Sequence, residues 1–431
     1  MGFVAFYLYA LVLLVRPQDW WLPLQNAPVV TVFLLAATLS AMFYRNKNLN
    51  YPQYYLGLLF IVHVVLSSVA NGWAGGGLIK GEKLLSGLFL PILCGAVLVD
   101  SQAKREKIFK LMIYAALFMV INGIVQRNSE DGFGLVGSKA TRDDVRITYI
   151  GILNDPNDLG MYFVMVLPII AYFVMQFSGF SRYLYLAYGF FILLGVYLTN
   201  SRGTLLGVIA LLGVWHWFSR GLKKTLWRAG LALPVLFLVM SKFRTIDAEE
   251  SSAAGRIDAW YEGMQMFLAN PVFGIGQGDF TDHHILTAHN SFVLVFSELG
   301  LPGYFIWIAI LYLTIFPLWK LFMRDRSGEE SRQVSGSESL AESANTIMPV
   351  VYHGQLLFYS MVGYLATAFF LSRSYTPLLY LFIGICLSCL EELRRADYIL
   401  EIETLKKNLL PIFALTLASI VGVWLVTKLF I

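Results

Sequence analysis

The sequence predicts an all-α, polytopic integral membrane protein with about 12 or 13 transmembrane helices. Hydrophobic residues make up 57% of its 431 residues and charged residues only 14%, a composition too apolar for a soluble globular protein. Apolar runs recur from one end of the chain to the other, and roughly 20 apolar residues cross a bilayer core as a helix. Basic residues gather in alternate connections between those runs, as they do in membrane proteins of fixed orientation.

Each expected transmembrane helix is a long apolar run with polar or aromatic residues at its ends. These runs are 2–15, 28–44, 53–70, 84–99, 107–125, 158–177, 183–199, 203–218, 226–241, 292–322, 348–372, 376–393 and 409–430. Arg16-Pro17 and two tryptophans follow the first run, without a small-residue cleavage site. We therefore expect the first run to be a retained helix and not a signal peptide.

The distribution of Lys and Arg predicts the orientation, because short basic connections stay in the cytoplasm. The connections expected on that side carry Arg45, Lys47, Lys104, Arg105, Lys107, Lys110, Arg182, Arg220, Lys223, Lys224, Arg228, Lys320, Arg324, Arg326, Arg332, Arg394, Arg395, Lys406 and Lys407. The net charge of +4 then reflects membrane topology, and no basic patch interleaved with aromatic residues indicates nucleic-acid binding. Cys94, Cys386 and Cys389 all fall in apolar runs, which favours buried packing over metal ligation or a disulfide framework.

The runs divide the chain into three expected regions. Residues 1–241 hold the first nine transmembrane helices and an extracytoplasmic loop at 126–158. Residues 242–290 form a long extracytoplasmic loop, and residues 291–431 hold the remaining transmembrane helices with a cytoplasmic loop at 324–346.

The long loop at 242–290 is expected to contain an amphipathic helix. From Ile257 onward, aromatic and apolar residues recur at helical spacing, at Trp260, Tyr261, Met264, Phe267 and Leu268. Asn270-Pro271 ends this pattern, and a glycine-rich turn follows at 273–278. A helix lying on the membrane surface would form a lid over a cavity between water and lipid. The alternative is an interfacial helix that only stabilises the loop.

Three basic residues expected on the extracytoplasmic face suit proton transfer or the binding of a diphosphate. His289, with Asn290 beside it, stands where an apolar helix begins, and an imidazole titrates in the range that a general base needs. Arg202 starts another apolar helix, where free N–H groups and a guanidinium together suit a diphosphate. Arg256 lies at the start of the lid helix. The alternative for both arginines is a side chain that extends to lipid headgroups.

Other polar residues on this face have more than one interpretation. Arg142 and Arg146 are further candidates for phosphate contacts, whereas Asn154-Asp155 suits a helix cap better than a substrate contact. Arg373 lies in a short connection expected on the same side, and Glu298 needs a buried partner that the sequence does not identify.

No metal site is expected among the loop histidines. His283 and His284 are adjacent and so point apart, and neither they nor His289 shows the spacing of a ligand pair. A site built from these three histidines with Asp279 or Asp282 is the alternative.

The segment from His289-Asn290 through nine residues to Gly300, two residues and Gly303 resembles the His-(Asn/Ser/Gln)-x9-Gly-x-x-Gly signature of the O-antigen ligases. Ser201-Arg202-Gly203 and the Arg256 helix with the sequence that follows it at 270–276 also resemble the core of that family, over about residues 195–305. We expect the two glycines to provide close helix packing or a bend that positions the histidine.

The resemblance implies a GT-C-like membrane fold and transfer of a glycan from undecaprenyl diphosphate to the lipid A–core oligosaccharide. It places the reaction at the periplasmic face of the bacterial inner membrane, without a metal or another cofactor. It also implies that His289 acts as the base, that Arg202 and Arg256 bind the diphosphate, and that Arg142, Arg146 and Asn290 are possible substrate contacts. Attack in line with the leaving group would invert the anomeric configuration.

Two related activities and two other classes remain as alternatives. An O-antigen polymerase or a protein O-oligosaccharyltransferase would use the same donor with another acceptor. A transporter would place ionisable groups near the bilayer midplane, whereas here they gather at one surface. A purely structural membrane protein would leave the lid and the two signatures without a role.

Overall fold

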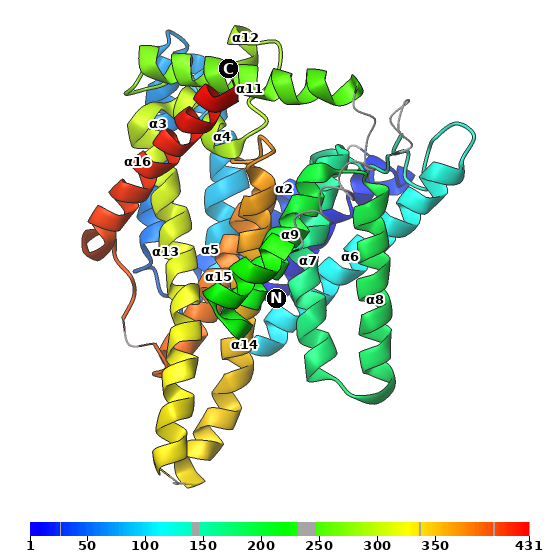
Figure 1. Ribbon diagram of the computed structural model, residues 1–431, viewed down its shortest axis with the longest axis vertical. Helices are drawn as coiled ribbons and strands as arrows, with labels where there is room; N and C mark the ends of the chain where they lie inside the picture. The colour runs from blue at the N-terminus through cyan, green and yellow to red at the C-terminus, as the bar shows by residue number, and fades with distance from the viewer. Residues whose placement is uncertain (26, 140–145, 232–246, 336–337, 400, 431) are drawn as a thin grey trace. The chain divides into compact units, whose positions relative to one another are not determined.

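The computed structural model describes the chain apart from residues 26, 140–145, 232–246, 336–337, 400 and 431 (Figure 1). Every regular element in the described residues is a helix, which confirms the predicted all-α fold class. The α-helices are α1 (Gly2–Leu14), α2 (Val29–Met42), α3 (Pro52–Ala70), α4 (Ala74–Leu84), α5 (Leu90–Leu98), α6 (Gln102–Asn128), α7 (Pro156–Gln176), α8 (Gly179–Leu198), α9 (Arg202–Arg220), α11 (Asp247–Ala269), α12 (Phe280–His283), α13 (Ser291–Ser335), α14 (Glu338–Ala368), α15 (Pro377–Arg395) and α16 (Leu405–Phe430).

Seven stretches of described helix are long and apolar enough to cross a membrane. They are Pro52–Ala70, Ala74–Leu98, Gln102–Asn128, Pro156–Gln176, Gly179–Leu198, Ser291–Met323 and Leu405–Leu429. Two shorter apolar helices lie at Gly2–Val15 and Val29–Met42. The chain is therefore a polytopic, all-α membrane protein.

The remaining expected spans are helical where the structure describes them. Those at 203–218, 348–372 and 376–393 correspond to α9, α14 and α15, while most of the span at 226–241 lies outside the described residues. The span expected from residue 84 instead begins at Ala74, because α4 continues through a π-helical turn at Leu85–Phe89 into α5.

The chain forms two compact units, each made of three separate segments. Unit 1 contains Met1–Ala37, Ser101–Ile246 and Leu318–Thr367, and unit 2 contains Thr38–Asp100, Asp247–Pro317 and Ala368–Ile431. The three regions expected from chain order, 1–241, 242–290 and 291–431, stay a prediction.

In unit 1, α7 is the central helix, and most of its side chains are buried. Its Tyr162 hydroxyl donates to the carbonyl of Met112 on α6 at 2.8 Å, and Ser360 on α14 donates to the carbonyl of Met165 on α7 at 2.8 Å. Asp155 caps α7 by accepting from the N–H of Asn157 at 2.8 Å, as expected from the sequence.

In unit 2, α15 is the most buried helix, and it packs against α5. Gln53 on α3 donates to Thr314 on α13 at 3.1 Å, and the hydroxyls of Tyr304 on α13 and Ser419 on α16 lie 2.7 Å apart. These contacts join the helices that support the loop at 270–290.

The helix predicted in the 242–290 loop is present as α11, which runs across the near-vertical α13 in Figure 1 and contacts α16, while its role as a lid stays a prediction. It ends at Ala269, immediately before Asn270-Pro271, where the sequence predicts its end. It begins at Asp247, upstream of the expected start at Ile257.

Candidate active site

His289 lies immediately before α13 in a left-handed backbone conformation. Its φ is +46°, a region that few residues other than glycine adopt and that histidine adopts more readily than most. Asn290 then caps the helix, since its Oδ1 accepts from the N–H groups of Phe292 at 2.9 Å and Val293 at 3.2 Å. The left-handed turn therefore places a half-buried histidine at the entrance of α13.

The side chain of Asn290 is completely buried, but only its oxygen is engaged. Its Nδ2 has no hydrogen-bond partner among the described residues. A buried donor left without a partner costs about 1–3 kcal/mol. This amide, adjacent to His289 in the chain, is thus suited to donate a hydrogen bond to a bound molecule.

The connection between α14 and α15 packs against the start of α13. The Ser291 hydroxyl donates to the carbonyl of Leu371 at 2.6 Å and accepts from the N–H of Arg373 at 2.9 Å. The Ser374 hydroxyl donates to the carbonyl of Ser291 at 2.8 Å. These contacts bring Arg373 to the His289 end of α13. In the sequence, Arg373 is marked only by its place in a short connection expected on the same face.

The helix α11 packs over the N-terminus of α13. Trp260 Nε1 donates to the carbonyl of Ala288 at 3.0 Å, directly before His289. Further along α11, the rings of Phe267 and Phe296 lie 5.4 Å apart. Arg256 precedes Trp260 by four residues and so lies on nearly the same side of α11. The structure thereby brings Arg256, half-buried, to the helix face that packs on the His289 segment.

The glycine-rich turn after α11 is bonded to a kink in α13. Gly300 lies at this kink with a φ of +66°, inside what is otherwise helix. The N–H of Gly276 donates to the carbonyl of Glu298 at 2.9 Å, and the N–H of Leu301 donates to the carbonyl of Pro271 at 2.8 Å. A β-carbon at Gly300 would lie 2.6 Å from the carbonyl carbon of Val272. The expected bend is confirmed, and the glycine-rich turn that follows α11 is bonded to it.

The next turn of α13 is held by α3. Gly303 faces the ring of His63, whose Nε2 is 2.7 Å from the carbonyl of Leu299. Ser67, also on α3, donates to the carbonyl of Phe273 at 2.6 Å. The expected close packing at Gly303 is therefore present, and α3 braces both the kink and the glycine-rich turn.

Glu298 is buried and accepts a hydrogen bond from the hydroxyl of Tyr375 at 2.9 Å. Tyr375 belongs to the same connection that packs on Ser291. This is the partner that the sequence left unidentified. The pair fixes one turn of α13 to the segment that carries Arg373.

His284 serves the local structure of the loop. His284 Nε2 lies 3.2 Å from the carboxylate of Asp258 on α11, and its Nδ1 lies 2.9 Å from the carbonyl of Leu286. Burial lowers the pKa of His284, but these hydrogen bonds raise it by more, so that its pKa lies above the ordinary value. In the described part of the chain, no group of three or more His, Cys, Asp or Glu side chains is arranged to hold a metal ion.

Unit 1 contains a second cluster around the start of α9. Asn200 has a φ of +45°, and Ser201 caps the helix by accepting from the N–H of Thr204 at 3.2 Å. Arg202 therefore occupies the first turn of α9, as the sequence predicts. The N-terminus of α9 therefore has the same order as that of α13: a residue with left-handed backbone, then a capping residue, then the helix.

Arg146 is bonded to this same entrance. Its Nε donates to the carbonyl of Thr199 at 2.9 Å, and its Nη2 donates to Oδ1 of Asn157 at 3.1 Å. That oxygen also accepts from the hydroxyl of Ser201 at 2.6 Å. The structure thus brings Arg146 together with the Arg202 turn, while the predicted candidate Arg142 lies outside the described residues.

Residues 187–308 match the family model described as O-antigen ligase. The matched stretch begins in α8 and ends in α13, and it contains Arg202, Arg256, His289 and Gly300. No curated protein matches the chain.

Proposed function

Because residues 187–308 match the O-antigen ligase family model, we propose that this protein transfers a glycan from undecaprenyl diphosphate to a hydroxyl group of the lipid A–core oligosaccharide. The family indicates a ligase-type or polymerase-type glycosyltransferase in a membrane. The lipid-linked donor, the lipid A–core acceptor and the periplasmic face of the bacterial inner membrane are the specific parts of the proposal.

His289 is the proposed base. It removes the proton from the acceptor hydroxyl while the oxygen forms a bond to the anomeric carbon of the donor. The bond between that carbon and the diphosphate oxygen breaks, undecaprenyl diphosphate leaves, and the anomeric configuration inverts. The observation that carries this proposal is the half-buried histidine at the entrance of α13, beneath a helix bonded to the preceding residue.

Arg202 and Arg256 are the proposed diphosphate ligands. Negative charge grows on the leaving diphosphate, and a guanidinium can donate two parallel hydrogen bonds to its oxygens. Arg202 adds the positive end of α9 to its own charge. Two arginines thus supply the charge neutralisation that a divalent cation supplies in other glycosyl transfers, and we propose a metal-independent reaction.

Asn290, Arg146 and Arg142 are proposed as further substrate contacts. The free Nδ2 of Asn290 supports a hydrogen bond to a sugar hydroxyl. Arg146 is supported by its position at the α9 entrance. Arg142 rests on the sequence alone.

The base is tested with His289→Ala, using purified protein, an undecaprenyl diphosphate-linked glycan and the lipid A–core acceptor. General base catalysis contributes about 10²- to 10⁴-fold, so transfer should fall by at least about 100-fold while the donor still binds. His283→Ala, at an exposed histidine in the same loop, is the matched control. Near-normal transfer by the His289 variant would refute the assignment.

The acceptor is tested by the lipid profile of cells that lack the protein. Loss of a ligase leaves long glycan on the lipid carrier and unmodified core. Loss of a polymerase leaves core that bears a single repeat, and that profile would replace the ligase assignment with the polymerase.

A further inference from the structure

Unit 2 carries a second polar cluster at the end far from His289. Helix α3 (Pro52–Ala70) lies between Tyr51 and Asn71, and the side chain of Asn71 donates to the carbonyl of Gly274 in the glycine-rich turn at 3.1 Å. Helix α15 (Pro377–Arg395) follows the Ser374 segment and ends at Arg395. Each helix has 19 residues and is therefore about 28 Å long, the thickness of a bilayer core. The Tyr51 and Arg395 ends thus mark the opposite end of this unit, which the basic residues predict to be cytoplasmic.

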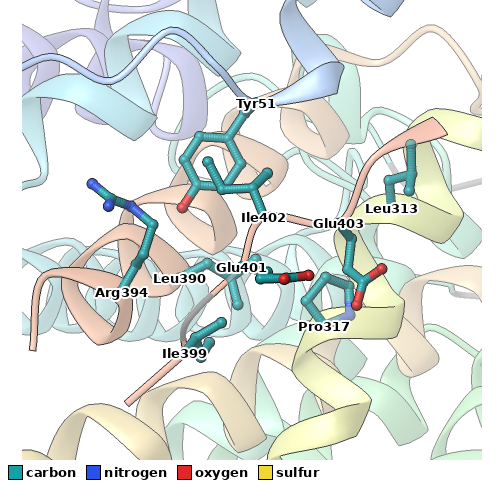
Figure 2. Close-up of a pocket in the computed structure, with 9 residues that line it drawn as sticks. All are labelled: Tyr51, Leu313, Pro317, Leu390, Arg394, Ile399, Glu401, Ile402 and Glu403. Atoms are coloured by element: carbon teal, nitrogen blue, oxygen red, sulfur yellow. The ribbon is translucent and has the colours of Figure 1, made fainter. Parts of the chain in front are cut away.

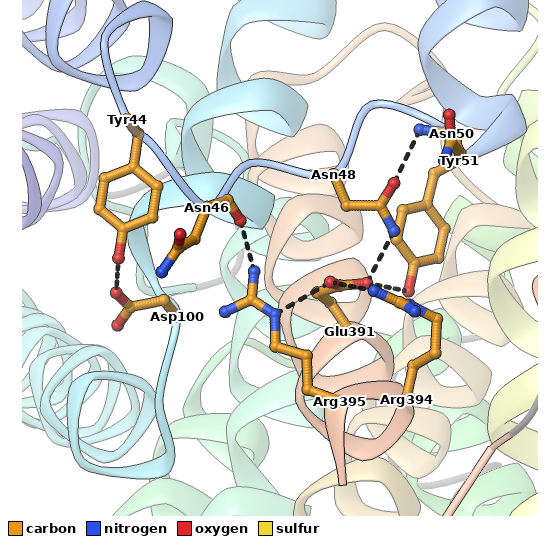
Figure 3. Close-up of polar contacts among 9 residues, drawn as sticks. All are labelled: Tyr44, Asn46, Asn48, Asn50, Tyr51, Asp100, Glu391, Arg394 and Arg395. Carbon is orange, nitrogen blue, oxygen red and sulfur yellow. Dashed lines mark hydrogen bonds and ion pairs between the residues drawn. The ribbon is translucent and has the colours of Figure 1, made fainter. Parts of the chain in front are cut away.

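Glu391 is the centre of this cluster (Figure 3). Its Oε2 accepts from Arg394 Nε at 2.9 Å, from Asn48 Nδ2 at 2.9 Å and from the Tyr51 hydroxyl at 3.2 Å. Its Oε1 accepts from Arg394 Nη2 at 2.8 Å and from Arg395 Nε at 3.0 Å. The carboxylate is therefore fully engaged by the groups around it, and it holds two guanidinium groups in fixed orientations.

The two arginines retain donors that the cluster does not use. Arg395 Nη2 donates to the carbonyl of Asn46 at 2.6 Å, so each guanidinium is engaged through its Nε and Nη2. In the part of the chain that the structure describes, the bonds from these arginines to Glu391 and Asn46 all come from Nε and Nη2, and none of them from Nη1. Glu391 thus orients the arginines without occupying their outer edges.

These arginines line an open groove of about 480 Å³, together with Asn46, Lys47, Asn48 and Glu391. Three cationic side chains against one carboxylate leave two net positive charges. Phe43 and Leu49, on either side of Lys47 in the chain, are 82% and 53% exposed. A basic groove flanked by exposed apolar side chains is typical of the level where headgroups meet acyl chains.

A neighbouring cavity is poorly suited to bind an anion. It measures about 20 Å³, which is room for about one water molecule. Arg394 lines it too, but Glu401 and Glu403 lie beside it (Figure 2). Its size and these carboxylates exclude an anion, which leaves the groove as the place where a phosphate can reach the arginines.

We propose that this groove binds a phosphate group, as the headgroup of an anionic phospholipid in the leaflet opposite the candidate active site. Arg394 and Arg395 would donate through their outer edges, and Lys47 would add a third charge. Free phosphate offers the same chemistry, so the experiment distinguishes the two sources.

The test is lipid retention by the purified full-length protein, measured by native mass spectrometry in detergent with equal amounts of phosphatidylglycerol and phosphatidylethanolamine. The wild type should retain phosphatidylglycerol preferentially. Each surface charge contributes about 1 kcal/mol to binding an anionic lipid, so Lys47→Gln should weaken retention about fivefold and Lys47→Gln/Arg395→Gln at least tenfold. The matched control, Arg182→Gln/Lys223→Gln, removes two exposed charges elsewhere on the same predicted side.

Adding excess sodium phosphate shows whether the bound phosphate group belongs to a lipid headgroup or to free phosphate. Retained phosphatidylglycerol supports a lipid headgroup, while its displacement supports soluble phosphate at the same arginines. Unchanged retention in a folded double variant overturns the proposal, as does an equal loss in the control. If the double variant does not fold, the single variant Lys47→Gln decides. Lys47 is exposed, and its side chain donates a hydrogen bond to the carbonyl of Met42 within its own segment.

Discussion

Gly300→Ala tests whether the kink in α13 attaches the lid. The native φ of +66° costs an alanine about 1–2 kcal/mol, since left-handed backbone brings Cβ against the following carbonyl. The new carbon would also lie 2.6 Å from the carbonyl carbon of Val272 and 2.7 Å from the carbonyl oxygen of Pro271. Both neighbours are backbone atoms, so relieving the contact must move the glycine-rich turn, at a further cost of about 1–3 kcal/mol. The expected destabilisation is about 2–5 kcal/mol.

Gly278→Ala separates the two contributions. Its φ is +83°, but a β-carbon there would meet no atom within 4 Å, so only the backbone cost of about 1–2 kcal/mol applies. The assay is thermal unfolding in detergent together with glycan transfer. We expect Gly300→Ala to melt lower than Gly278→Ala and to lose more activity, because the turn that it displaces follows α11. Equal melting points for the two variants would show that the kink does not carry this contact.

The remaining predictions concern the helix cap and the loop. Asn290→Ser keeps a capping oxygen while Asn290→Ala removes it, and both remove Nδ2, so the alanine variant should be less stable than the serine variant by about 1 kcal/mol. Both lose Nδ2 and should show transfer reduced about tenfold; full transfer in the serine variant would exclude the amide as a ligand contact. The raised pKa of His284 stabilises the fold below about pH 6.5, and this contribution disappears as the pH rises through the folded-state pKa. His284→Gln should therefore lower the melting temperature more at pH 5.5 than at pH 8.5, with His283→Gln as control. The loss in free energy of unfolding should stay below about 1 kcal/mol, because Asp258 is exposed. An equal loss at both pH values would contradict the ion pair.

Features set by neighbours in the chain were predictable from the sequence. Asn270-Pro271 stops α11 because proline cannot continue a helix, and Asp155 caps α7 through its own side chain. The bend at Gly300 follows from the same kind of local rule. Each of these depends on a few adjacent residues, which a single sequence displays.

Features set by distant neighbours were not predictable. Glu298 meets Tyr375 across 77 residues, and Ser291 meets Arg373 across 82. Neither pair has a spacing signal, because the contact exists only after α13, α14 and α15 have packed. The groove at Arg394 depends likewise on Asn48, which lies 343 residues from Glu391.

The attachment at Gly300 also sets a constraint on chain length. Nine residues of helix separate Asn290 from Gly300, so the direction of His289 is fixed relative to the turn that follows the lid. One added residue in this interval would rotate the two ends by about 100° and separate them by a further 1.5 Å or so. The interval therefore tolerates changes of side chain far better than changes of length, and it acts as a register between histidine and lid.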